Sequence, residues 1–294
     1  MIVTKLTGGL GNQLFQYAAG LSVAIANNTT LKLDISSYQI SSHRYRLDNF
    51  NITAEVLPIK TPSNLSQRIR KTILGRAISK LRREIEARIG SSGTRIYKDP
   101  GKFDPNVLSL PDGICLDGYW QSEKYFAHIA DIIRREFTPK PQPTPANKEM
   151  AERITNCESV NLHIRRGDYV SNPEYNRVHG TCDISYYKKA VEMLSEEVGN
   201  PCFFVFSDDI DWAKNNLQLK FPTTFVDING PDFDYEDLRL MTQCKHHIIA
   251  NSTFSWWGAW LCQYPQKIAI APSRWFRDPD KDAADIIPAG WRRV

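Results

Sequence analysis

Short apolar runs alternate with amphipathic segments along the second half of the chain. Runs of aliphatic and aromatic residues predict strands, whereas apolar positions three and four residues apart predict helices. The predicted strands are 159–164, 202–206, 223–227, 246–250 and 267–271, and the predicted helices between them are 184–198, 210–218, 233–244 and 254–263. Strands and helices in regular alternation are typical of a parallel, doubly wound sheet.

The first half shows the same alternation with a long interruption. Strands are predicted at 2–6, 30–35 and 114–117, and helices at 12–27 and 122–137. Prolines at every second position from Pro139 to Pro145 exclude both a helix and a central strand. They indicate a linker between two domains, with a long surface loop inside one domain as the alternative.

We therefore predict an α/β protein with two domains, each built on a parallel sheet. The expected parts are an N-terminal domain at 1–138, a proline-rich linker at 139–147, a second domain at 148–275 and a tail at 276–294. A return of the tail to the first domain is one expectation for it.

Composition narrows the class of protein. The chain has 294 residues, enough for two domains, and its net charge of +4 is too small to indicate a nucleic-acid partner. No apolar run approaches the roughly 20 residues that span a bilayer, and the first residues do not read as a signal peptide. Six cysteines without a CxxC pair argue against zinc and against a disulfide framework, so we expect a cytoplasmic location.

The segment 67–90 is basic and carries isoleucines near helical spacing. Such a helix either packs through its isoleucines with a solvated basic face, which we favour, or lies on anionic lipid. The second alternative predicts peripheral contact with the inner face of the membrane.

The predicted strand 159–164 ends in the run His163-Ile164-Arg165-Arg166-Gly167-Asp168. Guanidinium groups pair with phosphate oxygens in a bidentate way, and ligands of open α/β sheets bind outside the carboxyl ends of the strands. The run therefore predicts a site that binds a diphosphate. A surface pair of arginine and aspartate at a strand end is the alternative.

Two strand-to-helix junctions are further candidates for anion binding. The stretch 7–13, Thr-Gly-Gly-Leu-Gly-Asn-Gln, lets the backbone approach a ligand at a helix N-terminus, although a plain tight turn also needs glycine. The stretch 251–258, Asn-Ser-Thr-Phe-Ser-Trp-Trp-Gly, holds more hydroxyl groups than one helix cap requires. It is therefore a second candidate to bind the diphosphate.

Acidic residues add two candidates. Asp209-Ile210-Asp211 matches the DxD pattern that holds Mn²⁺ or Mg²⁺ on a nucleotide sugar, but it can also cap the helix that follows, which we favour. Asp237, in the predicted helix 233–244, can accept hydrogen bonds from both N1–H and N2–H of guanine. A solvated position on the helix surface is the alternative for this residue.

Taken in order, these motifs resemble the bacterial α-1,2-fucosyltransferases of glycosyltransferase family 11. The resemblance rests on the stretches 8–18, 118–126, 163–169, 207–209, 251–260 and 272–276, and it covers most of the chain outside about 52–95. It implies a GT-B fold, in which two Rossmann-like domains face a cleft. It also implies inverting transfer of fucose from GDP-β-L-fucose to the 2-hydroxyl of a galactose-containing glycan, as in surface polysaccharide synthesis, with no metal or other cofactor.

The resemblance implies a role for each matching residue. Arg165 would neutralise the departing diphosphate, and Asp168 would act as the catalytic base or orient an arginine, with Glu174 and His179 as alternative bases. The implied donor-binding residues are Asn12, Gln13, His163, Arg166, Ser207, Asp208, Asp237, Asn251, Ser252, Thr253 and Phe254. The residues expected on the acceptor side are Tyr119, Trp120, Gln121 and His179.

Two other functions are compatible with parts of the sequence. One is a glycosyltransferase that uses a different nucleotide sugar, with a metal held by the DxD pattern. The other is a noncatalytic carbohydrate-binding module, which would have no need of diphosphate-binding motifs in two domains.

Overall fold

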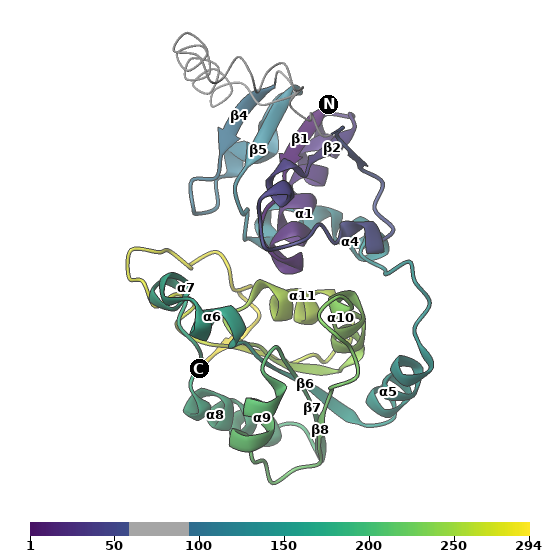
Figure 1. Ribbon diagram of the computed structural model, residues 1–294, viewed down its shortest axis with the longest axis vertical. Coiled ribbons are helices and arrows are strands. Elements are labelled where there is room, and N and C mark those ends of the chain that lie inside the picture. The colour runs from purple at the N-terminus through teal and green to yellow at the C-terminus, as the bar shows by residue number, and fades with distance from the viewer. Residues whose placement is uncertain (59–93) are drawn as a thin grey trace. The chain divides into compact units, whose positions relative to one another are not determined.

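The computed structural model describes residues 1–58 and 94–294, drawn in colour in Figure 1. The basic segment 67–90 lies outside these residues, so a membrane-surface helix there stays a prediction. The chain forms two compact units. The first consists of 1–46, the described part of 52–120, and 124–133, and the second consists of 47–51, 121–123 and 134–294.

The first unit contains a five-stranded sheet in which every pair of neighbouring strands is parallel. Its order is β3-β2-β1-β5-β4, with β1 (Ile2–Lys5), β2 (Leu31–Asp34), β3 (Glu55–Val56), β4 (Arg95–Lys98) and β5 (Ile114–Asp117). Helix α1 (Leu10–Ala26) packs against β1 and is buried over most of its length. Gly20 makes this contact possible, since a Cβ there would lie 2.0 Å from the Thr4 hydroxyl.

The predicted helix 122–137 is wrong over its first half. The structure has short 3₁₀ turns at η4 (Glu123–Tyr125) and η5 (Ala127–Ile129), and α4 (Ala130–Glu136) follows them. Tyr125 donates to the Lys102 carbonyl, whereas the next ring, Phe126, packs edge-on against Phe15. Both contacts are with residues distant in sequence, so the spacing of apolar residues within 122–137 does not predict them. The other 3₁₀ helices are η1 (Ser36–Gln39), η2 (Leu47–Asn49) and η3 (Pro105–Ser109).

The second unit contains a six-stranded parallel sheet of order β11-β10-β9-β6-β7-β8. Its strands are β6 (Glu158–Ile164), β7 (Pro201–Ser207), β8 (Thr223–Phe225), β9 (His246–Ile248), β10 (Ala269–Ala271) and β11 (Arg292–Arg293). Read along the chain, this is the 3-2-1-4-5-6 order of a Rossmann fold, with the reversal point beside β6. The prediction of parallel α/β architecture is confirmed.

Helices cover both faces of this sheet, as Figure 1 shows. The helices of the second unit are α5 (Pro145–Thr155), α6 (Gly167–Ser171), α7 (Pro173–Val178), α8 (Ile184–Ser195), α9 (Ile210–Asn216), α10 (Asp234–Gln243) and α11 (Thr253–Leu261). Successive side chains of β7 alternate between the faces. Phe203 and Val205 pack with α8 and α9, whereas Phe204 and Phe206 pack with α5 and α10. Within the described residues, no helix is long and apolar enough to cross a membrane.

The proline-rich stretch and the tail differ from the expectation. Helix α5 begins inside the predicted linker, because the Thr144 side chain caps it and Pro145 occupies its first turn, where proline is well tolerated. The tail joins the second unit rather than the first, since β11 pairs with β10 and Trp291 packs against Trp256. Residues 47–51 also belong to the second unit, where Phe50 contacts Phe137 and forms a bridge to Pro139.

Two polar residues sit in the centre of the second sheet. The side chains of Asn161 on β6 and His247 on β9 lie 3.2 Å apart, between Nδ2 and Nδ1, and both residues are fully buried. Burial holds the pKa of His247 well below its usual value of 6.5. The folded protein therefore keeps this imidazole neutral at a pH where the unfolded chain takes up a proton.

This difference predicts an acid-sensitive fold. Stability from the neutral His247 is complete above about pH 6.5 and is lost as the pH falls, by up to about 1.4 kcal/mol per pH unit for one proton. We expect the urea midpoint of the wild type to fall more steeply between pH 7 and pH 5 than that of His247→Gln, followed by tryptophan fluorescence. Equal slopes for the two proteins would contradict the assignment.

Candidate active site

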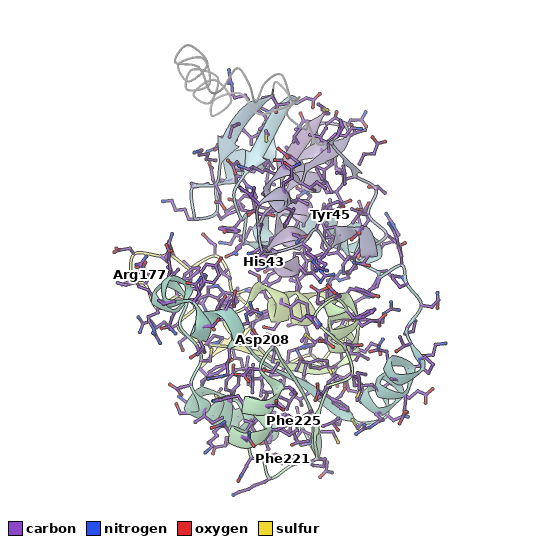
Figure 2. All side chains as sticks on the ribbon, in the orientation of Figure 1. His43, Tyr45, Arg177, Asp208, Phe221 and Phe225 are labelled. Carbon is purple, nitrogen blue, oxygen red and sulfur yellow. The ribbon has the colours of Figure 1, made fainter. Side chains whose placement is uncertain are left out.

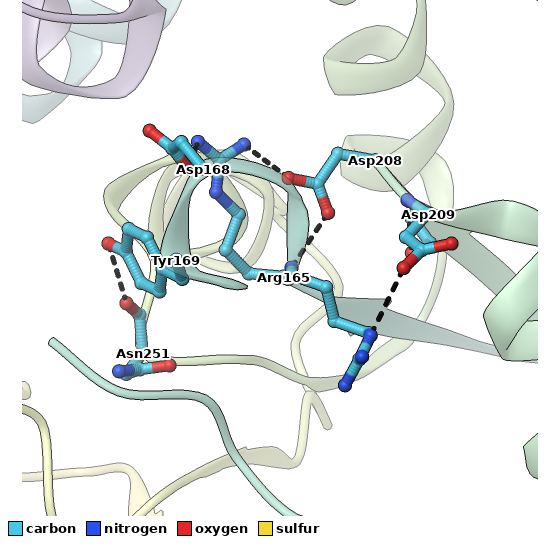
Figure 3. Close-up of polar contacts among 8 residues, drawn as sticks. Arg165, Asp168, Tyr169, Asp208, Asp209 and Asn251 are labelled. Atoms are coloured by element: carbon cyan, nitrogen blue, oxygen red, sulfur yellow. Dashed lines mark hydrogen bonds and ion pairs between the residues drawn. The ribbon is translucent and has the colours of Figure 1, made fainter. Parts of the chain in front are cut away.

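The site lies at the carboxyl ends of the adjacent strands β6 and β7. Ile164 and Ser207 are partners in the register of these strands, so the residues that follow each strand emerge side by side. Arg165 to Asp168 follow β6, and Asp208 and Asp209 follow β7 (Figure 3). This is the edge at which doubly wound sheets bind their ligands.

Arg165 is held between two carboxylates. Its Nη2 lies 2.6 Å from Oδ1 of Asp168 and its Nη1 lies 2.9 Å from Oδ2 of Asp208, as Figure 3 shows for the second pair. The guanidinium carbon lies 5.3 Å from the centre of the Tyr169 ring. Burial lowers the pKa of Arg165, but the charges of Asp208 and Asp168 outweigh burial and the net shift is upward. The site therefore contains a fixed, permanently charged donor.

Asp208 also shapes the backbone of this turn. Its Oδ1 accepts a hydrogen bond from the Arg166 backbone N–H at 2.8 Å. A Cβ at Gly167 would lie 2.4 Å from the Asp208 Oδ2, so only glycine fits there without displacing the carboxylate. Figure 2 labels Asp208 close to α6, the helix that begins at Gly167.

Arg166 is held differently from Arg165. Its Nε lies 3.2 Å from Oδ2 of Asp209, and its guanidinium lies 3.8 Å from the ring centre of Trp212. Asp209 also caps α9 by accepting from the Trp212 N–H, and its own N–H donates to the Ser207 hydroxyl. The Ser207-Asp208-Asp209 run therefore supplies partners to both arginines and to a helix. Among the described residues no group of three His, Cys, Asp or Glu side chains could hold a metal ion.

His163 is fully buried on β6, next to this arginine. Burial, and then the charge of Arg165, lower its pKa to about 3, so the ring is neutral. Its ring centre lies 5.8 Å from that of Phe254, and its Nδ1 has no hydrogen-bond partner among the residues that the structure describes. A buried imidazole with an unused nitrogen can bind a polar ligand group without changing its own charge.

Asn251 connects three segments instead of pointing freely into the site. Its Nδ2 lies 3.1–3.2 Å from the carbonyls of His179, Gly180 and Trp275, and its Oδ1 accepts from the Cys182 thiol at 3.5 Å. Ser252 precedes α11, and its hydroxyl makes no capping hydrogen bond. Thr253 and Phe254, both half-buried, form the first turn of this helix.

The candidate bases of the following loop are placed differently from one another. The His179 ring stacks on Tyr169 at 4.7 Å and lies 5.6 Å from Phe276, and burial lowers its pKa. Glu174 is exposed on α7. The aromatic stack therefore connects His179 to Arg165 through Tyr169.

Asp237 lies in the first turn of α10 and is half-buried. Its Oδ1 accepts a hydrogen bond from Nδ2 of Asn229 at 2.8 Å. Burial is the main cause that raises its pKa to about 7. The hydrogen bond from Asn229 opposes this shift, and the charges of Asp234, Glu236 and Asp227 add to it. This carboxyl group therefore titrates near neutrality.

In the first unit, the glycine-rich turn is fixed by α1. Gly8 has a positive φ of 77°, which favours glycine. Gln13 is fully buried and donates to the carbonyls of Gly8 and Arg44, while its Oε1 accepts from the Arg46 N–H. The Asn12 side chain lies 2.7 Å from the position a Cβ of Gly8 would take. The buried Gln13 side chain therefore holds the glycine-rich turn through its hydrogen bonds to the backbone.

The expected acceptor-side residues follow β5. Tyr119 is 48% exposed, whereas Trp120 is fully buried and has a positive φ of 56°. Oδ2 of Asp99 accepts from the N–H groups of Tyr119 and Trp120 at 2.9 and 2.7 Å, which holds this unusual backbone in place. Gln121 belongs to the second unit, so the three residues do not form one cluster within a unit.

Several supporting residues were missed by the sequence analysis. Gln16 joins the Thr7 N–H to the Gly118 carbonyl, with 3.0 Å for each hydrogen bond. Its signal is a second polar residue on the otherwise apolar face of α1. Trp212 and Asn229 carry no such signal, because their roles depend on contacts between distant segments.

Comparisons with known proteins identify the family of the chain. The family model described as glycosyl transferase family 11 matches residues 1–294. The chain is 37% identical to an alpha-1,2-colitosyltransferase of Escherichia coli, over 100% of this chain and 99% of that protein. It is 32% identical to the O-antigen biosynthesis glycosyltransferase WbnK of Escherichia coli, over 94% of this chain and 95% of the relative.

A solved structure of an Arabidopsis thaliana FUT1 mutant in complex with GDP has a similar fold. Its TM-score is 0.51 at 12% identity, covering 98% of this chain and 74% of that one. The fold is of the GT-B type, as the motifs implied. The chain belongs to glycosyltransferase family 11, a family of enzymes that transfer sugars.

The close contact at Gly167 predicts the effect of a single methyl group. Gly167→Ala must displace the Asp208 carboxylate, so we expect a loss of about 1–3 kcal/mol in the free energy of unfolding. Gly199→Ala is the matched control, since a Cβ there meets no atom within 4 Å. Urea unfolding of both variants measures the difference, and equal stabilities would argue against this role of Asp208.

Proposed function

We propose that the chain transfers L-fucose from GDP-β-L-fucose to the 2-hydroxyl of a galactose-containing glycan, with inversion and without a metal ion. The observation that carries this proposal is Arg165, fixed by Asp168 and Asp208 at the ligand-binding edge of a Rossmann sheet in a family 11 chain. The relative named for O-antigen biosynthesis supports a surface polysaccharide as the acceptor class.

The proposed role of Arg165 follows from the charge that develops during transfer. Breaking the bond between sugar and phosphate concentrates negative charge on the diphosphate. A donor that is already oriented stabilises this charge without reorganising, typically by a few kcal/mol. Arg165 is oriented by two ion pairs before any ligand binds. We assign Arg166, restrained by Asp209 and Trp212, to a supporting position beside it.

The remaining donor contacts are assigned by position. At the same sheet edge, Nδ1 of His163 has no partner among the described residues and the Ser252 hydroxyl makes no capping hydrogen bond. We propose that these two residues bind the nucleotide together with Thr253 and Phe254. Asp237 would read the guanine edge. From the first unit, Asn12 would contact the donor. Gln13 and Asn251 would act by holding the turns, because their side chains are occupied by backbone groups.

Asp168 is the proposed second catalytic residue. In the structure its carboxylate orients Arg165, and deprotonation of the acceptor hydroxyl would require an oxygen that this ion pair leaves accessible. Asp168→Asn keeps a hydrogen-bond acceptor for Arg165 but removes the basic group. Loss of a general base typically costs 10²–10⁴ in rate.

Tyr119 is the proposed contact for the acceptor. Its exposed ring stands on a backbone that Asp99 holds in an unusual conformation, and an aromatic ring with a polar tip suits a sugar. Trp120 would support this ring from the core, and Gln121 and His179 remain acceptor-side proposals within the second unit.

GDP-colitose is the second candidate donor. It is favoured by one specific observation, the 37% identity to the alpha-1,2-colitosyltransferase over the whole chain. Colitose is fucose without its 3-hydroxyl, so the two donors present the same diphosphate and nucleobase. Only the sugar distinguishes them, and the ratio of kcat/KM for GDP-fucose and GDP-colitose decides between the two activities.

The metal-independent mechanism predicts full turnover in EDTA. We expect transfer from GDP-fucose to lactose to be unaffected by the chelator, because Asp209, the first aspartate of the DxD pattern, is already used by Arg166 and by the start of α9. Arg165→Lys should lower kcat by roughly 10²–10³, as for loss of one preorganised donor. Lys5→Arg, a conservative change in the other unit, is the control. Loss of turnover in EDTA that added Mn²⁺ restores would favour the DxD alternative.

The raised pKa of Asp237 predicts how GDP binding depends on pH. Because guanine N–H groups need an ionised acceptor, binding below about pH 7 must release the proton of Asp237. We expect the affinity for GDP to rise with pH through 7, with proton release measured by calorimetry in buffers of different ionisation enthalpy. Asp237→Asn should bind GDP more weakly and lack this part of the proton release. An identical proton release in the variant would refute the role of Asp237.

A further inference from the structure

The loop between β8 and α10 leaves two large apolar side chains exposed, close in sequence to the half-buried carboxyl group of Asp237. Ile228 is 39% exposed and Phe233 is 47% exposed. Phe233 immediately precedes α10, four residues before Asp237, and residues four apart at the start of a helix lie on the same side. An exposed aromatic face therefore stands near the carboxyl group that titrates near neutrality.

A hydrogen-bond network fixes the orientation of this carboxyl group. Asn229 and Asn147 exchange hydrogen bonds of 2.8 and 2.9 Å through their amides, and Nδ2 of Asn147 also donates to the Thr144 hydroxyl. The second hydrogen of the Asn229 amide reaches Oδ1 of Asp237 at 2.8 Å. Every amide hydrogen of the pair is thus used, and Asn229 can only present its NH₂ group to Asp237.

We propose that Phe233, Asn229 and Asp237 form the nucleobase subsite for the donor, with Phe233 stacking on the base and Asn229 positioning the carboxylate that reads its edge. This inference rests on the proposed use of a guanine nucleotide sugar. Stacking recognises any base, since each has a π-face. Selection among bases comes from the carboxylate of Asp237. The amide network orients this carboxylate so that it can accept hydrogen bonds from the N1–H and N2–H of guanine.

The two roles have separable signatures in binding. Calorimetry with GDP, inosine diphosphate and inorganic pyrophosphate probes the whole ligand, a base without the 2-amino group, and no base. Phe233→Ala should weaken GDP and inosine diphosphate about equally, by roughly tenfold, and leave pyrophosphate unchanged. Asn229→Ala should weaken GDP selectively, so that the preference for GDP over inosine diphosphate shrinks. Ile228→Ala is the matched control and should leave all three affinities unchanged.

The outcomes separate this inference from the proposed function. A wild type that binds GDP no better than UDP would overturn both. Clear preference for GDP together with unchanged GDP affinity in Phe233→Ala would overturn the stacking role alone. We expect this variant to fold, because the Phe233 side chain is exposed. An unaltered ratio of GDP to inosine diphosphate affinity in folded Asn229→Ala would overturn the positioning role. If Asn229→Ala does not fold, Asn147→Ser tests the same network from its buried end.

Discussion

The contact on which the site depends is the carboxylate of Asp208. One oxygen pairs with the Arg165 guanidinium and the other accepts from the Arg166 backbone, so a single side chain from β7 sets both the charge and the turn that follow β6. Two neighbouring strands of a parallel sheet bring these residues together, and their register does so without any contribution from a long loop. A cation fixed in this way keeps its direction before a ligand arrives, which is what electrostatic stabilisation of a leaving group requires.

The strands of the second unit could be predicted because buried parallel strands read as continuous apolar runs. β6 and β7 lie where the apolar runs 159–164 and 202–206 predicted them. The short edge strands β3, β4 and β11 could not be predicted, since they are partly exposed and carry polar residues. The start of helix α5 could not be predicted, because prolines precede it and Pro145 is its first residue.

The sequence was enough to predict which residues gather at the site, but not which of them pair with one another. Motif order and strand ends were enough to group Arg165, Asp168 and Asp208 at one edge. The partners of Arg166 and Asn251 depend on Trp212 and on the carbonyls of two distant loops, and no local pattern records such contacts. The same limit explains why the pairing of Asn147 with Asn229, 82 residues apart, has no trace in the sequence.

The passage of the chain between the units has a consequence for recombination among relatives. Residues 47–51 and 121–123 are built into the second unit, where Phe50 contacts Phe137 and Glu123 accepts from the Trp260 indole. A chimera joined at the proline-rich stretch would inherit these two insertions from the wrong parent and would lose their matched partners. The second unit is therefore exchanged intact between homologous enzymes only when 47–51, 121–123 and 134–294 are transferred together. A single breakpoint in a gene does not achieve this.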